Sequence, residues 1–189
     1  MPTRQDFILR YIYWYLKHPM WLFKWIIVRI SGIDIALSAR ISHRAHFEKQ
    51  GGKIIIGDRA TINDYVKIIA QGNTIEIGTD VSINYNSILY GHGGLTIGDN
   101  TRIAAHCMFI PMNHKYDDLN ILIKDQGITK KGIVIGSDVW IGARVTVLDG
   151  VIIGNGVVVG AGSLVCKNLS PNGVYVGNPA HLIKYRGKK

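Results

Sequence analysis

The chain has 189 residues, of which 47% are hydrophobic, and carries two cysteines and a formal net charge of +9. This length suffices for one domain with a sizeable core and an appendage. Two cysteines without a Cys-x-x-Cys spacing argue against a disulfide framework and indicate a reducing compartment, with the cytosol as the expectation. The basic excess indicates an anionic partner, but no nucleic-acid-binding module fits the chain, so no nucleic acid is expected.

Residues 1–32 form an aromatic and basic segment that differs from the rest of the chain. Pro19 divides it, so the pattern predicts two short helices. Basic residues interrupt the apolar run within residues 4–30, leaving no stretch long enough to span a bilayer and no signal peptide. Two interpretations remain open. The helices cap the open end of the following domain, contact anionic lipid on the inner face of the cytoplasmic membrane, or do both, one face docking on the domain while the other meets lipid.

Within residues 33–177 an apolar residue recurs every six positions, in six groups of three. A six-residue unit with one inward aliphatic side chain cannot bury itself, so successive units must wind into stacked coils that share one core. Gly follows seven of these positions, and we interpret it as a corner residue that turns the chain without a Cβ penalty. The pattern predicts an all-β solenoid, a parallel β-helix. Its apolar positions are Ile35, Ile41 and Phe47; Ile56, Ile62 and Ile68; Ile77, Ile83 and Leu89; Ile97, Ile103 and Phe109; Ile135, Ile141 and Val147; Ile153, Val159 and Val165.

One loop interrupts this repeat. Residues 111–132 are rich in Asn, Asp, Lys and Gly and have no six-residue register. Because a long loop in a compact domain costs entropy, it is usually functional. His114 lies in this loop, and imidazole is the side chain best suited to proton transfer near neutral pH. After the loop the repeat resumes, and the chain ends in a basic tail, residues 178–189.

Residues 75–184 resemble the hexapeptide-repeat acetyltransferases, in the branch that contains the galactoside and maltose acetyltransferases and the O-acetyltransferases of bacterial surface polysaccharides. The resemblance rests on INYNSI at 83–88, NHKYDD at 113–118, IVIGSDVWIG at 133–142, VIIGNGVVVGAGSLVCKN at 151–168 and GNPAHLIK at 177–184. It implies a left-handed β-helix, whereas general sterics alone would favour right-handed crossovers. It also implies a homotrimer with active sites between neighbouring subunits, and acetyl transfer from acetyl-CoA with no metal required.

The resemblance gives several residues a role. His114 would be the general base and the Ala143 N–H the oxyanion donor. Asn84 would bind the acceptor sugar. Trp140 would lie beside the site or pack against a neighbouring subunit. The coenzyme would contact Gly142, Ala143, Gly160, Ala161, Lys167, Asn178, Pro179 and Lys184.

Two departures from the family pattern bear on the substrates. His181 stands where a basic residue, commonly Arg, contacts the coenzyme, so we expect either weaker coenzyme binding or a contact shifted to Lys184 and Arg186. His92 stands where the sugar-modifying members often carry an acidic residue. Tyr85, Tyr90 and His92 would instead offer a stacking face and neutral donors to a larger carbohydrate. The expected acceptor is therefore a sugar of a surface polysaccharide or its lipid-linked precursor.

Alternative functions remain open. Transfer to the amino group of a nucleotide-linked sugar is the close rival of O-acetylation. A γ-carbonic-anhydrase-like zinc enzyme would need three His ligands, and the spacing of His92, His106 and His114 does not match that family well. A non-catalytic scaffold would use the repeat as a spacer.

Overall fold

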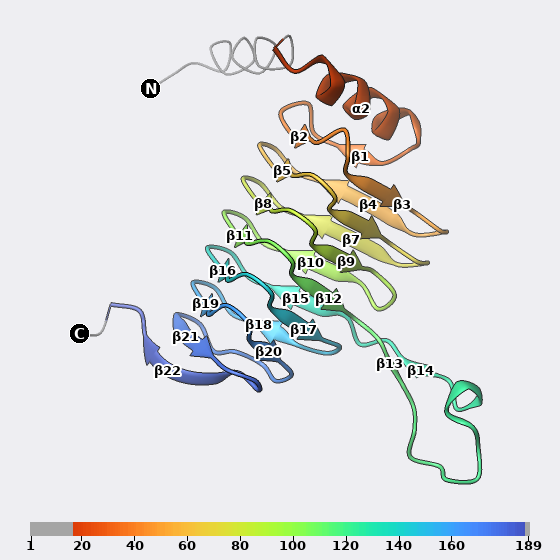
Figure 1. Cartoon of the computed structure of the whole chain (residues 1–189), viewed down its shortest axis with the longest axis vertical. Coiled ribbons are helices and arrows are strands. Elements are labelled where there is room, and N and C mark those ends of the chain that lie inside the picture. Colours follow the sequence, from red (N-terminus) through yellow and green to blue (C-terminus); the bar gives the residue numbers. More distant parts are fainter. Residues whose placement is uncertain (1–16, 188–189) are drawn as a thin grey trace.

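The computed structural model describes residues 17–187, which form a parallel β-helix of six coils with a helix at one end (Figure 1). Each coil contributes one short strand to each of three parallel sheets, here called A, B and C. The coils are numbered 1 to 6 in chain order, and each begins with its strand in sheet A. The predicted solenoid is thereby confirmed. Of the two predicted N-terminal helices, α2 (Pro19–Ile30) is described, and the segment before it lies outside the described residues.

The strands are short because each coil turns after two to four paired residues. Sheet A holds β1 (Asp34–Ile35), β4 (Lys53–Ile56), β7 (Thr74–Ile77), β10 (Leu95–Ile97), β15 (Ile133–Ile135) and β18 (Ile152–Ile153). Sheet B holds β2 (Arg40–Ile41), β5 (Thr61–Ile62), β8 (Ser82–Ile83), β11 (Arg102–Ile103), β16 (Trp140–Ile141), β19 (Val158–Val159), β21 (Gly173–Val176) and β22 (His181–Tyr185). Sheet C holds β3 (His46–Glu48), β6 (Lys67–Ile69), β9 (Ile88–Tyr90), β12 (Met108–Ile110), β17 (Thr146–Leu148) and β20 (Leu164–Val165).

The predicted apolar positions form the core. Seventeen of the eighteen are buried, and equivalent positions stack in register, as Ile41 does on Ile62 and Ile62 on Ile83. Phe47 is half-buried because it lies in the first coil, where the Lys24 ammonium sits 5.8 Å from the centre of its ring. The six-residue period therefore identifies the core almost residue by residue.

The physical reason for glycine at these corners differs from the one that the sequence suggested. Gly98 does not have a positive φ, and a Cβ there would lie 2.6 Å from the carbonyl carbon of Gly136 in the next coil. The left-handed residue of that corner is Asn100, with φ of 60°. Close stacking of successive coils, and not backbone conformation, therefore requires glycine at this position, so the corner interpretation was wrong in its physical reason.

We expect Gly98→Ala to destabilise the protein by about 1–3 kcal/mol, because the added methyl group overpacks a backbone contact that cannot move aside. Gly72→Ala is the matched control: its φ is 85° but nothing lies within 4 Å of the added Cβ, so only the strain of about 1 kcal/mol applies. Thermal melts compare the two variants. A Gly98→Ala protein that melts at the wild-type temperature would mean that close stacking of the coils does not require glycine at this position.

Helix α2 covers the open end of coil 1 (Figure 1). Pro19 begins it with a fixed φ that suits a first helical turn. Val28 is buried in the core, and Trp25 Nε1 donates a hydrogen bond of 3.1 Å to the carbonyl of Ala36. Helix α2 therefore caps the solenoid at coil 1. No helix within residues 17–187 is both long and apolar enough to cross a membrane.

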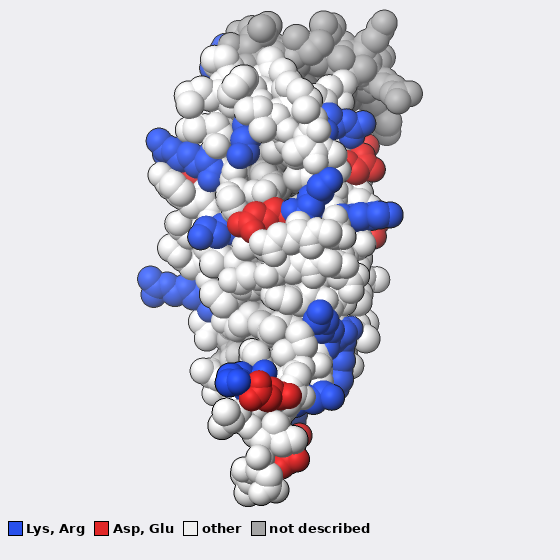
Figure 2. All heavy atoms as spheres, turned by 90° about the vertical axis from the view of Figure 1, so that its right-hand side faces the viewer, with Lys and Arg blue, Asp and Glu red and all other residues white. Residues whose placement is uncertain are grey.

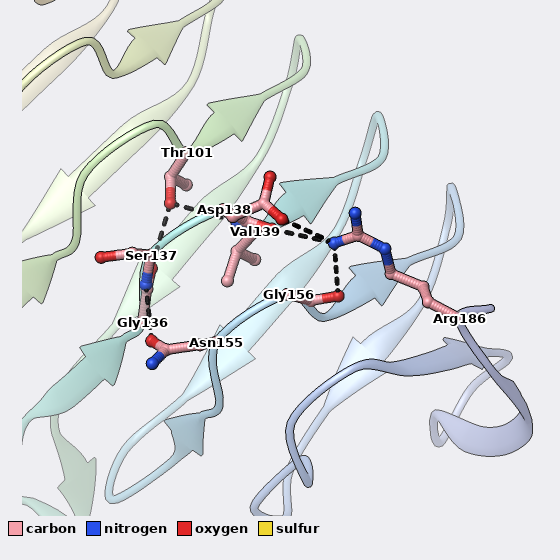
Figure 3. Close-up of polar contacts among 8 residues, drawn as sticks. All are labelled: Thr101, Gly136, Ser137, Asp138, Val139, Asn155, Gly156 and Arg186. Carbon is pink, nitrogen blue, oxygen red and sulfur yellow. Dashed lines mark hydrogen bonds and ion pairs between the residues drawn. The ribbon is translucent and has the colours of Figure 1, made fainter.

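The basic tail closes the other end of the solenoid. Strand β22 pairs antiparallel with β21 and so extends sheet B into the tail. Arg186 Nη1 donates hydrogen bonds of 2.9 Å to Asp138 Oδ2 and 2.9 Å to the carbonyl of Gly156 (Figure 3). The side chain thereby fastens the tail to the corners of the last two coils, which are themselves joined by the Asn155 amide oxygen accepting from Ser137 N at 2.8 Å.

Candidate active site

Two lines of corners flank sheet C. The corners between sheets B and C form what we call the B–C edge, comprising residues 42–45, 63–66, 84–87, 104–107, 142–145 and 160–163. The corners between sheets C and A form the C–A edge, comprising residues 49–52, 70–73, 91–94, 111–132, 149–151 and 166–168. The edge on which a residue lies decides which other residues it can meet.

The B–C edge brings several predicted site residues into one line. Asn84 and Tyr85 lie in coil 3, Gly142 and Ala143 in coil 5, and Gly160 and Ala161 in coil 6. Backbone hydrogen bonds join these corners: His106 N donates to Tyr85 O at 2.9 Å, Arg144 N to Ala105 O at 3.0 Å, and Gly162 N to Ala143 O at 2.8 Å. The corners predicted to hold the acceptor and the coenzyme are therefore continuous.

The peptide group between Gly142 and Ala143 has a fixed orientation. Its carbonyl oxygen accepts a hydrogen bond from the buried Cys107 Sγ at 3.1 Å. Because the N–H and C=O of a trans peptide point in opposite directions, the Ala143 N–H points away from the core. Within residues 17–187 it donates to no acceptor. Burial raises the pKa of the Cys107 thiol, which keeps its proton available for this contact.

Asn84 is held by its neighbours. Its Nδ2 donates to the carbonyl of Ile103 at 2.8 Å, and its Oδ1 accepts from Asn63 Nδ2 at 3.1 Å. One N–H and one lone pair of the half-buried amide remain for a ligand. Tyr85 beside it is 50% exposed. This corner can thus present one fixed amide and one aromatic face.

Trp140 projects from sheet B close to this edge. It is 57% exposed and lies in register between Arg102 in the previous coil and Val158 in the next. Its ring is available for contact with a ligand or with another subunit, and both roles predicted for it stay open.

His114 lies on the opposite edge. The loop forms a hairpin of β13 (Asn113–His114) and β14 (Ile128–Thr129), with a short 3-10 turn, η1 (Ile123–Asp125), between the two strands, and it reaches well beyond the coils (Figure 1). His114 is exposed and pairs with Ile128. No side chain described in residues 17–187 hydrogen-bonds to its ring, and the Asp118 carboxylate accepts instead from Asn120 N at 2.8 Å. The predicted base therefore lies on an exposed hairpin, with its ring in solvent.

His92 lies near the root of this hairpin, on the same C–A edge. Its Nδ1 is buried without a hydrogen-bond partner, and its ring centre is 5.9 Å from that of Tyr90. Burial, and secondarily the charge of Lys130, lower the pKa of His92, so the ring is neutral at neutral pH. As expected from the sequence, it can act as an uncharged polar contact.

One chain therefore holds the predicted site as two halves on opposite edges of sheet C. Asn84, Tyr85 and Ala143 lie on the B–C edge, whereas His92 and His114 lie on the C–A edge. This division between the two edges could have been predicted from the sequence. Each group of three apolar positions makes one coil, so residues after its second position fall on the B–C edge and residues after its third fall on the C–A edge.

The residues predicted to contact the coenzyme are likewise divided between different parts of the solenoid. The corner of Gly160 and Ala161 continues into the turn before β22, because Gly177 N donates to Ser163 Oγ at 3.0 Å, and this turn holds Asn178 and Pro179. Gly162, with φ of 72°, has no atom within 4 Å of a built Cβ, so the corner is open enough for pantetheine to approach the backbone. Lys167 lies on the C–A edge of the same coil, away from this track, and Lys184 is exposed on β22.

The charged groups near the site are unevenly placed. Figure 2 shows scattered Lys and Arg on the side that carries the C–A edge, with fewer Asp and Glu. The Arg186 guanidinium is occupied by Asp138, which leaves Lys184 as the free cation of the pair expected to meet the coenzyme. Within residues 17–187 no three His, Cys, Asp or Glu side chains lie together in a group that could hold a metal ion.

Comparisons with known proteins agree with the solenoid fold. Residues 132–167 match the family of bacterial transferase hexapeptide repeats (six repeats), whose repeats form a left-handed β-helix. The chain is 32% identical over 161 residues to the galactoside O-acetyltransferase of Escherichia coli K12, covering 82% of this chain and 78% of the relative. It is also 32% identical over 136 residues to "Probable acetyltransferase Rv3034c" of Mycobacterium tuberculosis, covering 72% of this chain but only 43% of that protein.

A solved structure is similar over most of the chain. It is a variant of AntD, an N-acyltransferase from Bacillus cereus, in complex with dTDP-4-amino-4,6-dideoxyglucose and coenzyme A. The TM-score is 0.75 at 25% identity, over 85% of this chain and 88% of AntD. With its hexapeptide repeats, the extruded His114 loop and these relatives, the chain belongs to the hexapeptide-repeat acetyltransferases.

Proposed function

We propose that this enzyme transfers an acetyl group from acetyl-CoA to a hydroxyl group of a sugar in bacterial surface-polysaccharide biosynthesis. The observation that carries the proposal is the outward Ala143 N–H on the same edge as the Asn84 corner and the small-residue corner at Gly160 and Ala161. A backbone donor between a sugar-binding corner and a corner open to pantetheine is suited to acyl transfer.

A second copy of the chain completes the site in this proposal. The exposed His114 hairpin reaches away from its own coils, and the B–C edge of its own chain lies across sheet C. A cyclic trimer with parallel solenoid axes repeats one contact three times, so each hairpin meets the B–C edge of its neighbour. His114 and His92 then face Asn84 and Ala143 of the adjacent subunit.

The mechanism requires no covalent acetyl-enzyme. A ring nitrogen of His114 takes the proton of the acceptor hydroxyl as its oxygen attacks the thioester carbonyl. The Ala143 N–H donates to the oxyanion of the tetrahedral intermediate. Collapse of this intermediate expels the coenzyme thiolate, which recovers the proton from the His114 imidazolium.

One observation favours a second acceptor class. AntD is an N-acyltransferase crystallised with a dTDP-linked amino sugar, and the fold similarity covers 85% of this chain. Transfer to the amino group of a nucleotide-linked sugar is therefore the alternative. It uses the same His114 and Ala143 chemistry, with the amine as nucleophile.

Acetyl-CoA turnover tests the proposal, with release of free thiol measured over a panel of sugar acceptors and nucleotide-linked amino sugars, and with coenzyme binding measured by calorimetry. Turnover with a hydroxyl acceptor supports O-acetylation. Turnover confined to amino sugars replaces it with the alternative. If calorimetry detects no coenzyme binding, the proposal fails and the protein is a non-catalytic scaffold.

Cys107 positions the oxyanion donor, because its S–H holds the carbonyl of the peptide that carries the Ala143 N–H. We expect Cys107→Ala to lower kcat about tenfold, the effect of about 1.4 kcal/mol, with KM for acetyl-CoA little changed. Cys107→Ser keeps a donor and should restore most of kcat. If Ala and Ser lower kcat equally, or if kcat follows only the loss of thermal stability, Cys107 has a packing role alone.

A further inference from the structure

Helix α2 has an apolar stripe on the side that faces away from the solenoid. Met20, Phe23, Ile27 and Ile30 are 58%, 66%, 46% and 80% exposed. Spacings of three and four residues put them on one side of a helix, while Val28 and Trp25 on the other side hold coil 1. A contiguous exposed apolar face of this kind is typical of an interaction site.

The charge at this end of the molecule is strongly positive. Residues 1–67, which include α2 and nearly all of the first two coils, contain eleven Lys and Arg against five Asp and Glu, so they hold +6 of the net charge of +9. Arg29 lies on α2 itself, where its guanidinium pairs with Asp34 at 3.0 Å, and the Lys49 ammonium lies 3.4 Å from the carbonyl of Gly32, just past the end of the helix. An apolar helix face at an end of the molecule with this positive excess complements an anionic lipid surface.

Composition points to the same partner. Three of the four tryptophans and three of the nine tyrosines lie in residues 1–30, and both residue types concentrate at membrane–water interfaces. The apolar and aromatic sequence of residues 1–16 leads directly into α2. At twelve residues α2 is about 18 Å long, which is too short to cross the hydrocarbon layer of a bilayer, about 30 Å thick, but sufficient to lie in its surface.

We propose that this end of the molecule docks on an anionic lipid bilayer, with Met20, Phe23, Ile27 and Ile30, here called the docking stripe, facing the lipid and the solenoid axis standing upright on the membrane. In the proposed trimer the three solenoids are parallel, so three docking stripes face one plane and bind together. The docking itself does not depend on the acetyl-transfer chemistry.

Vesicle flotation with the full-length protein tests this proposal. Vesicles of phosphatidylcholine alone are compared with vesicles in which about a third of the lipid is phosphatidylglycerol. We expect the wild type to float with the anionic vesicles, with weaker binding at raised salt. Phe23→Glu should weaken binding at least tenfold. Ile152→Glu introduces the same charge at a residue that is 52% exposed on sheet A of the last coil, and it should bind as the wild type does.

Three results would overturn the proposal. The first is no binding to anionic vesicles, and the second is an equal loss of binding in Phe23→Glu and Ile152→Glu. The third is that Phe23→Glu breaks up a larger assembly seen by light scattering in the absence of lipid, which would make a second copy the occupant. A fluorophore on Phe23→Cys, in a Cys166→Ser background, adds a further check. If a soluble quencher cannot reach it without lipid, another part of the chain already covers the stripe.

This proposal and the proposed function fail separately. His114→Ala should float with anionic vesicles as the wild type does, because the hairpin is remote from α2 (Figure 1). Phe23→Glu should turn over a soluble acceptor at the wild-type rate, since α2 packs on β1 and β2 of coil 1, whereas the residues assigned to catalysis lie in coil 3 or beyond.

Discussion

His114→Ala should lower acetyl-CoA turnover by a factor of about 10² to 10⁴, the usual contribution of a general base. The side chain is exposed and, within residues 17–187, makes no hydrogen bond through its ring, so its removal should leave stability nearly unchanged. The measurement is kcat by thiol release at saturating acceptor, together with the affinity for coenzyme by calorimetry.

The matched control for this variant is His106→Ala. His106 is exposed on the B–C edge, and no catalytic role is assigned to it. Its φ is 62°, so we expect His106→Ala to change the melting temperature modestly. Turnover by His106→Ala should stay within a few-fold of the wild type. A His114→Ala enzyme that keeps full activity would leave the family assignment intact but remove His114 as the base.

Ala143→Pro should lower kcat by a factor of about 10² to 10³, the cost of removing one oxyanion donor. Arg144, with φ of 58°, occupies the left-handed position of this corner, and Ala143 precedes it without a positive φ. Pro is well tolerated at the position before such a residue in a turn, so the substitution removes the N–H while the corner keeps its shape. The measurement is kcat, with thermal melts to confirm that the fold is retained.

Ala105→Pro is the corresponding control. Ala105 precedes His106, which has a φ of 62°, so it occupies the same corner position one coil earlier, and its N–H likewise has no acceptor within residues 17–187. It tests whether proline itself disturbs this edge. Equal losses of kcat in the two variants would show that the effect comes from the corner and not from the Ala143 donor.

The same two variants test whether the halves of the site come from different subunits. His114→Ala disables one edge and Ala143→Pro the other, so trimers assembled from an equal mixture should regain about a quarter of wild-type activity if each site joins two chains. No recovery after unfolding and joint refolding, with mixed trimers confirmed by mass spectrometry, would mean that both edges act within one chain.

The fold followed from the sequence because a six-residue period leaves little freedom. Each of Ile62, Ile83 and Ile103 must point inward if the coils stack, and each is buried. The reason for Gly98 was not predictable in the same way. Glycine is favoured both by a positive φ and by close backbone contact, and only the coordinates distinguish a corner that turns at Asn100 from one that turns at the glycine.

The candidate site was predicted less completely. The loop was predictable because the six-residue repeat stops there, and His114 was predictable because the NHKYDD motif at 113–118 contains it. The contact from Cys107 to Gly142 joins residues 35 positions apart in neighbouring coils, and no local pattern indicates it. The engagement of Arg186 by Asp138, 48 positions apart, was missed for the same reason.

The stacked coils also set a length. Successive strands of a sheet are about 4.8 Å apart, and two complete coils separate α2 from the Asn84 corner in coil 3. The solenoid thus holds the Asn84 corner at a fixed height, about 10 Å beyond the first coil, on which α2 packs. Inserting or deleting one whole coil between them would move that corner by a single step without altering its local geometry. The number of early coils therefore determines how far an acceptor must extend from whatever surface α2 rests on.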